Sequence, residues 1–339
     1  MKVLLVGGTG VISTGVAELA IKKGMEVYVL NRGLRNHLLV PGCKSIVADF
    51  RGEDEDIIKA LGDHHFDVVV DFITFNSDQL QKSVRIFKGR TDQYIFISSG
   101  TVYKKPLDNY IITEDAPKGN LHSFYARNKL ACEAALMEAY EKDGFPATIV
   151  RPSLTYADFK FVLSLSSGPH PYTIINRMRR GKQIIVQGDG NSLWTITHTS
   201  DFAKGMVGLF GNKAAIGEDF HITTDEVQDW NRIYTKIAHA AGVEANIIHI
   251  ATDFLGEYDN RYFDRLAGDH ACSAVFDNSK IKKFVPDFKC TMTFEEGAKR
   301  VVDYFDADPA NRATIDEEWD REMDDIIYRY TAYKRIYNQ

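Results

Sequence analysis

The chain has 339 residues, of which 44% are hydrophobic and 26% are charged. This composition is typical of a globular protein and excludes wholesale disorder. The length suits one large domain or two domains that share a cleft. The formal net charge of −6 disfavours a nucleic-acid partner, because a polyanion would approach against the mean field of the protein.

The sequence predicts no metal centre and no membrane span. Its four cysteines are scattered without a CxxC pair, and we expect them to be free thiols in a reducing compartment. The apolar run at the N-terminus is too short for the core of a signal peptide or for a membrane span. We therefore expect a soluble cytoplasmic protein.

Strands and helices alternate through the first half of the chain. Apolar runs predict strands at residues 2–6, 26–30, 45–48, 67–71, 93–98 and 147–151. Periodicity and composition predict helices at residues 15–23, 54–61, 77–87 and 122–143. This alternation predicts βαβ units in a doubly wound, parallel Rossmann sheet, and hence the α/β class.

The pattern changes after Pro152, where clusters of glycine, proline and serine interrupt the elements. Later strands are predicted at residues 193–199 and 246–250, and later helices at 201–210, 230–241, 294–305 and 316–333. We predict a dinucleotide-binding domain at 1–152, to which 193–220 return. Residues 153–192 and 221–310 are predicted to form a smaller C-terminal substrate-binding lid, and 311–339 a helical extension.

A glycine-rich turn joins the first strand to the first helix. It contains Gly7, Thr9, Gly10, Val11 and Ile12, and small residues here let the backbone approach a pyrophosphate that faces the unpaired amides of the helix. A serine stands at the usual place of the third glycine and is small enough for close packing. The alternative is a structural turn with no ligand, but the flanking strand and helix favour a dinucleotide.

The second strand ends at Asn31 and Arg32, where an NAD enzyme commonly offers a carboxylate to the adenosine ribose. A guanidinium in its place favours a 2′-phosphate, because arginine binds phosphate in a bidentate way. We therefore expect NADP in preference to NAD. Asn31 could also bind a free hydroxyl, and Arg32 could simply be solvated.

Tyr125 and Lys129 are four residues apart near the start of a long predicted helix, so their side chains share a face. A nearby ammonium is expected to lower the pKa of the phenol and to suit it for acid–base work. Ser98 and Ser99 follow the fifth strand, at the sheet edge where open α/β sheets bind ligands. A hydroxyl there can hold a substrate oxygen while Tyr125 moves its proton.

Together these segments resemble the extended short-chain dehydrogenase/reductase superfamily, the NAD-dependent epimerase/dehydratase group. The resemblance covers nearly the whole chain and rests on the segments GGTGVIS, SSGTVY, TED, YARNK, RPS, GDG, HTSD and DNSKIKKFVPDF. It implies that Tyr125 is the acid/base, that Lys129 holds the nicotinamide ribose and that Ser99 holds the reacting hydroxyl.

The same resemblance implies that Asp49 and Phe50 lie near adenine and that Pro152 and Ser153 flank the nicotinamide. Dehydratases of the group carry an acidic pair after the central hydroxyl residue, where this chain has Gly100 and a threonine. This difference favours epimerisation or simple redox chemistry over dehydration.

The substrate is expected to be a small molecule, a nucleotide sugar or related sugar, by analogy of fold. Four residues are candidates for contacting it: Thr101, Tyr156, Arg179 and Trp194. For the aromatic ones, buried packing is the alternative, and for Arg179 a solvated helix face. A regulatory or RNA-binding protein on the same scaffold remains the competing function, and a homodimer through residues 77–87 and 122–143 is expected by analogy.

Overall fold

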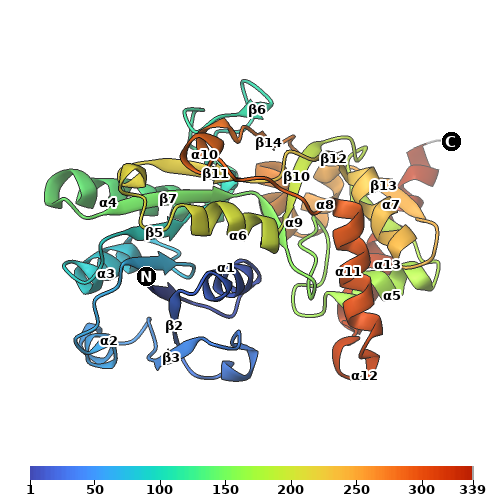
Figure 1. The fold of residues 1–339 in the computed structure, drawn as a ribbon. Coiled ribbons are helices and arrows are strands. Elements are labelled where there is room, and N and C mark those ends of the chain that lie inside the picture. Colours follow the sequence, from blue (N-terminus) through green and yellow to red (C-terminus); the bar gives the residue numbers. More distant parts are fainter. Residues whose placement is uncertain (338–339) are drawn as a thin grey trace.

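The computed structural model describes residues 1–337 and is built around a seven-stranded parallel sheet (Figure 1). The strand order is β11-β7-β5-β4-β1-β2-β3. The strands are β1 (Lys2–Val6), β2 (Glu26–Asn31), β3 (Lys44–Val47), β4 (Val68–Asp71), β5 (Tyr94–Ile97), β7 (Ala147–Pro152) and β11 (Asp219–Ile222). The predicted doubly wound α/β sheet is therefore confirmed, and its chain order reverses at β1, between β2 and β4.

Alternation along the buried strands produces two apolar faces. Val3 and Leu5 pack toward α1 (Val11–Lys22) and α6 (Thr199–Gly208), whereas Leu4 packs on the opposite face. That opposite face is covered by α2 (Asp54–Leu61), α3 (Ser77–Phe87) and α4 (Phe124–Asp143). Helices on both sides bury the central strands of the sheet, which explains why these are nearly continuous apolar runs. The edge strand β3 is mostly exposed, and its Val47 is 58% exposed.

A smaller region packs beside the carboxyl ends of the strands (Figure 1). It has a core of its own, which includes Trp194, Trp230 and Phe294. Its strands are β6 (Ile111–Ile112), β8 (Leu154–Tyr156), β9 (Ile184–Gln187), β10 (Leu193–His198), β12 (Val227–Asp229), β13 (Ile247–Ile250) and β14 (Val275–Phe276). Its helices are α5 (Tyr172–Arg179), α7 (Trp230–Ala240), α8 (Thr252–Tyr258), α9 (Asn260–Arg265), the π-helical turn η4 (Leu266–His270), α11 (Phe294–Asp306), α12 (Pro309–Arg312) and α13 (Glu317–Tyr337).

The boundaries between the two regions differ from the prediction at two places. Residues 193–220 do not return as a unit, because β10 pairs with β8 and β12 in a separate sheet, and only α6 and β11 rejoin the large one. Conversely, α10 (Ser279–Phe284), which the prediction gave to the lid, buries Ile281 against the α1–α6 face of the large sheet.

The structure describes the predicted C-terminal extension, residues 311–339, as far as residue 337, and residues 338 and 339 lie outside the described part of the chain. Its helix α13 is held by Arg177, which is 1% exposed and pairs with Asp320 at 2.8 Å and Asp324 at 2.7 Å. None of the helices within residues 1–337 combines the length and the apolarity that crossing a membrane requires.

Candidate active site

A cavity of about 760 Å³ lies between the glycine-rich turn and the smaller region. It brings together predicted residues from four separate segments: Gly7, Thr9, Gly10, Val11, Ile12, Ser98, Ser99, Thr101, Tyr125, Lys129, Pro152 and Ser153. The carboxyl ends of β1, β5 and β7 meet at this edge because the strands are parallel. This edge is where an open α/β sheet is expected to bind its ligand.

The glycine-rich turn is shaped for close approach of a ligand to the backbone. Gly7 has φ +88°, and a Cβ there would lie 2.1 Å from Cγ2 of Ile73. Gly10 is the N-cap of α1 and has no side chain to cap the helix, and the first turn carries no acidic residue. The positive end of α1 therefore faces the cavity without an anionic partner, which fits a pyrophosphate.

A second cavity, of about 430 Å³, continues from the turn past the ends of β2 and β3. Four predicted residues line it: Asn31, Arg32, Asp49 and Phe50. The side-chain oxygen of Asn31 accepts from the amide of Gly33 at 2.6 Å. Its Nδ2 is buried and has no hydrogen-bond partner among the described residues, so a ligand with an acceptor oxygen would satisfy it.

Arg35 and Arg51 also line this second cavity, and we had predicted neither. Together with Arg32 they bring three guanidinium groups to one small cavity, and within residues 1–337 none of the three forms an ion pair with a carboxylate. The sequence did carry a signal for them, because Arg51 directly follows Phe50 and Arg35 lies three residues after Arg32. The second cavity is thus the most basic part of the site wall.

Helix α4 positions Tyr125 and Lys129. Ser123 is its N-cap and accepts from the amide of Ala126 at 3.3 Å. Lys129 is 4% exposed, and its Nζ donates to the carbonyl oxygens of Thr74 and Ile97 at 2.8 Å each. The same Nζ lies 5.9 Å from the centroid of the Tyr125 ring, so the predicted pair does share one face of the helix.

The predicted lowering of the pKa of Tyr125 is wrong. Although 40% of this residue is exposed, desolvation by the surrounding cavity raises its pKa to about 12, and a hydrogen bond with Ser99 only partly opposes that rise. Burial also lowers the pKa of Lys129. The phenol is therefore protonated at neutral pH, and additional positive charge is needed before it can act as a base.

The smaller region contributes four unpredicted titratable residues: Asp264, Arg265, Asp269 and His270. They come from α9 and η4, where the sequence shows no recognisable pattern or motif. Asp264 accepts from the amide of Phe124 at 3.0 Å, so this region is bonded to the first turn of α4. Burial raises the pKa of Asp269 to about 7 against the opposing charges of Lys105 and Arg265.

Three of the four candidate substrate residues lie away from the cavity, and only Thr101 lines it. Tyr156 is 1% exposed and packs edge-on against Phe294. Trp194 is 2% exposed and packs against Trp230. Arg179 pairs with Asp306 at 2.7 Å on both nitrogens. Burial in the core and ion pairing, rather than ligand contact, explain these residues.

Comparisons with known proteins identify the family and the fold. The profile of the NAD dependent epimerase/dehydratase family matches residues 3–223. The chain is 23% identical over 293 residues to 2′-dehydrokanamycin reductase of Streptomyces kanamyceticus, covering 85% of this chain and 80% of that one. It is 25% identical over 346 residues to the chloroplast stem-loop binding protein of 41 kDa b of Arabidopsis thaliana, covering 96% and 84%.

Among solved structures, UDP-glucuronic acid 4-epimerase from Bacillus cereus in complex with NAD shares the fold with a TM-score of 0.71. It is 19% identical, and the match covers 91% of this chain and 99% of that one. The chain therefore belongs to the NAD dependent epimerase/dehydratase family and is an NAD-dependent enzyme of the extended short-chain dehydrogenase/reductase type.

Proposed function

We propose that this enzyme is an NADP-preferring epimerase or reductase that acts on a hydroxyl or keto carbon of a nucleotide sugar, with Tyr125 as acid/base. One observation carries the proposal: Tyr125, Lys129 and Ser99 line the same cavity as the glycine-rich turn. A hydroxyl-bearing substrate in that cavity would meet a phenol, a hydroxyl and an ammonium together with the dinucleotide.

The chemistry divides between cofactor and protein. When bound, a nicotinamide dinucleotide would supply the hydride chemistry at the substrate carbon. Tyr125 takes the proton from the substrate hydroxyl or returns it, while Ser99 holds the same oxygen. Lys129, fixed by two backbone carbonyls, keeps one N–H for the ribose. The positively charged ring of an oxidised nicotinamide would supply the additional positive charge that Tyr125 needs to act as a base.

The preference for NADP is supported by the second cavity. Arg32, Arg35 and Arg51 line it and form no ion pair within the described residues, so a phosphate would relieve their mutual repulsion. The buried Nδ2 of Asn31 offers a further donor to a ribose or phosphate oxygen. A free 2′-hydroxyl would leave these charges uncompensated.

A phosphate-bearing substrate is supported by cations around the first cavity. Arg35 and Arg265 line it, and burial together with the charges of Arg265 and Arg35 lowers the pKa of Lys160. None of these three has a carboxylate within ion-pair distance in the part of the chain that the structure describes. Converging cations of this kind favour a diphosphate. UDP-glucuronic acid 4-epimerase, which shares the fold, is named for such a substrate.

Dehydration is disfavoured by packing as well as by sequence. A Cβ at Gly100 would lie 2.4 Å from Cζ of Phe276 and 3.3 Å from the carbonyl oxygen of Pro152. Position 100 therefore has no room for an acidic side chain. Epimerisation or net redox chemistry needs no such group.

The test is to incubate the purified protein with UDP-glucose, UDP-galactose, UDP-glucuronic acid and UDP-N-acetylglucosamine, each with NADP or NADPH. The absorbance of the reduced nicotinamide and the stereochemistry of the sugar are then followed. Changed stereochemistry without net absorbance change is expected of an epimerase, and stoichiometric oxidation or reduction of the cofactor of a reductase. Absence of cofactor binding would contradict the proposal.

RNA binding is a second candidate, because one relative at 25% identity is named a stem-loop binding protein. The net charge of −6 opposes it, and the basic cluster at positions 32, 35 and 51 lines a small cavity rather than an open face. A stem-loop RNA that is retarded in a gel at physiological salt would support it. Unretarded RNA, together with bound NADPH, would leave the enzyme as the only candidate.

A further inference from the structure

A buried carboxylate lies directly behind the proposed catalytic residues. Glu133 is on α4, one turn beyond Lys129, and is 5% exposed. One carboxylate oxygen accepts from the hydroxyl of Ser98 at 2.5 Å and from Nε of Arg151 at 2.7 Å. The other accepts from Nη2 of Arg151 at 2.7 Å. A single side chain thus joins the end of β5, helix α4 and the end of β7.

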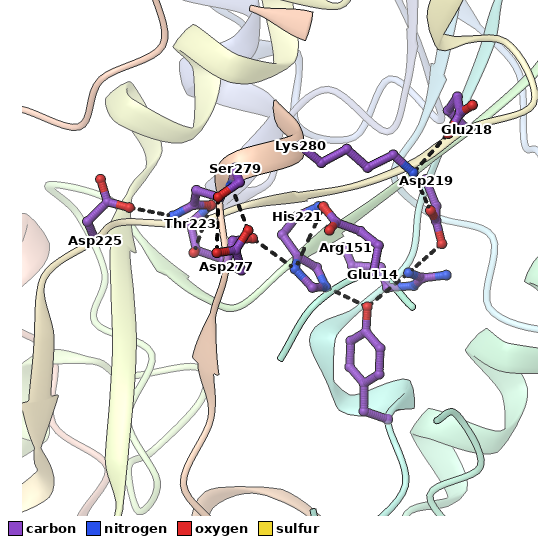
Figure 2. Close-up of polar contacts among 12 residues, drawn as sticks. Glu114, Arg151, Glu218, Asp219, His221, Thr223, Asp225, Asp277, Ser279 and Lys280 are labelled. Carbon is purple, nitrogen blue, oxygen red and sulfur yellow. Dashed lines mark hydrogen bonds and ion pairs between the residues drawn. The ribbon is translucent and has the colours of Figure 1, made fainter. Parts of the chain in front are cut away.

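The partner Arg151 is held just as firmly from its other side. It is 1% exposed and pairs with Asp219 at 2.7 Å (Figure 2). Its Nη1 also donates to the phenol oxygen of Tyr103 at 2.9 Å, and that hydroxyl lies 2.5 Å from Nε2 of His221. Although burial alone would raise it, the charges of Arg151 and Lys280 lower the pKa of Asp219 to about 2. If the guanidinium of Arg151 turned, a buried polar group would lose its hydrogen-bond or ion-pair partner.

Each of the three joined segments carries a residue that lines the first cavity. Ser98 precedes Ser99, Arg151 precedes Pro152, and Lys129 is on the same helix face as Glu133. A buried ion pair such as this one contributes little net stability compared with apolar side chains of similar volume. The two hydrogen bonds from the planar guanidinium and the one from the serine hydroxyl fix the relative positions of these groups rather than stabilising the fold.

We propose that Glu133 is a positioning residue, which sets the relative placement of Ser99, Lys129 and Pro152 through its bonds to Ser98 and Arg151. This inference rests on the proposed cofactor-binding role of Lys129. Glu133 touches neither cavity, so it acts only through the residues that it holds.

The charge of Glu133 also affects the pKa of Lys129, which a residue with a purely structural role would not do. Burial lowers the pKa of Lys129, and the charges of Asp71 on β4 and of Cys132 and Glu133 on α4 oppose that fall. Tyr125 is the other titratable group that faces the ammonium, at 5.9 Å from the ring centroid. Removing the charge of Glu133 lowers the pKa of Lys129 further, so the ammonium is lost at a lower pH.

The experiment measures the Kd of NADPH against pH by cofactor fluorescence, which requires no identified substrate. Binding is expected to weaken at alkaline pH as Lys129 loses its proton, and in Glu133→Gln this midpoint moves to lower pH. Glu114→Gln is the matched control, because Glu114 is 6% exposed and accepts from the amide of His221 without joining the cavity. Its midpoint should equal that of the wild type.

A second variant guards against failure to fold. Ser98→Ala removes one hydrogen bond to Glu133 and strands no charge, and it should weaken NADPH binding about 10-fold. A folded Glu133→Gln variant with the wild-type midpoint, or Ser98→Ala with wild-type affinity, would overturn the inference. If wild-type protein binds no NADPH at any pH, the proposed function fails instead, so the two failures are distinguishable.

Discussion

Replacing Arg51 with alanine tests the cofactor preference most sharply, because its side chain makes no hydrogen bond or ion pair with the residues that the structure describes. The side chain of Arg51 is exposed, and within residues 1–337 it makes no ion pair, while only its backbone amide is bonded, to Asp49 at 3.0 Å. Folding stability should therefore stay within about 0.5 kcal/mol of the wild type.

The magnitude follows from the chemistry of the lost contact. A hydrogen bond to a charged group contributes about 1.5–3 kcal/mol, and exposure of the guanidinium places Arg51 near the lower end. We therefore expect the Kd of NADPH to rise about 10-fold, with a change of less than about 2-fold for NADH, which lacks the phosphate. The effect should shrink as salt is raised, because the guanidinium is open to solvent.

The assay is fluorescence titration of both reduced cofactors against the wild type, Arg51→Ala and Arg321→Ala. Arg321 is a suitable control because it is 71% exposed and pairs only with Glu317, on the surface of α13. An equal loss of affinity for NADPH and NADH would show that Arg51 contacts the part that the two cofactors share. Unchanged NADPH binding in Arg51→Ala would refute the phosphate contact of Arg51.

Two further predictions concern stability. Gly15→Ala should destabilise the protein by about 1–3 kcal/mol in chemical denaturation, because a Cβ there would lie 2.5 Å from Oγ1 and 2.9 Å from the carbonyl oxygen of Thr199. Gly168→Ala, with nothing within 4 Å of its Cβ, should cost far less, and equal losses would contradict this packing. Burial lowers the pKa of His221 to about 3, whereas in the unfolded chain it is near 6.5. As pH falls between these values the unfolded state binds the extra proton, so this histidine makes stability fall by up to about 1.4 kcal/mol per pH unit. His221→Gln should flatten the dependence of unfolding free energy on pH between 6 and 4, and an unchanged slope would argue against a neutral buried histidine.

Much of the large sheet was predictable because it obeys simple patterns. Strands that are buried on both faces appear in the sequence as apolar runs. Each end of the six strands predicted in the first half lies within one residue of the corresponding end in the structure. The seventh strand, β11, escaped prediction because Phe220 and Ile222 alternate with polar residues in a segment of only four.

The cofactor half of the site was predictable for a similar reason. Gly7, Ser99, Tyr125 and Lys129 each stand at a fixed offset from a predicted strand or helix end, and parallel strands bring such ends together. The residues that line the cavity from the smaller region were not predictable, since η4 has no sequence period. The sequence shows only that Lys129 is near Tyr125, whereas desolvation by the whole cavity is what raises the pKa of the phenol.

The roles of the candidate substrate residues Trp194 and Arg179 could not be predicted from the local sequence pattern. Trp194 and Arg179 are equally suited to contact a sugar or to fill a core and pair with a carboxylate. Their roles depend on partners more than thirty residues away, Trp230 and Asp306. No local sequence feature separates the two outcomes.

The most direct measurement of the central claim is turnover and NADPH affinity in Tyr125→Phe. Loss of the hydroxyl removes the proton carrier but keeps the ring that packs at 5.8 Å from Phe75, so the account predicts turnover reduced at least about 100-fold with NADPH affinity within about 3-fold of the wild type. Full turnover in this variant, on a substrate that the wild type converts, would contradict the assignment of Tyr125 as the acid/base.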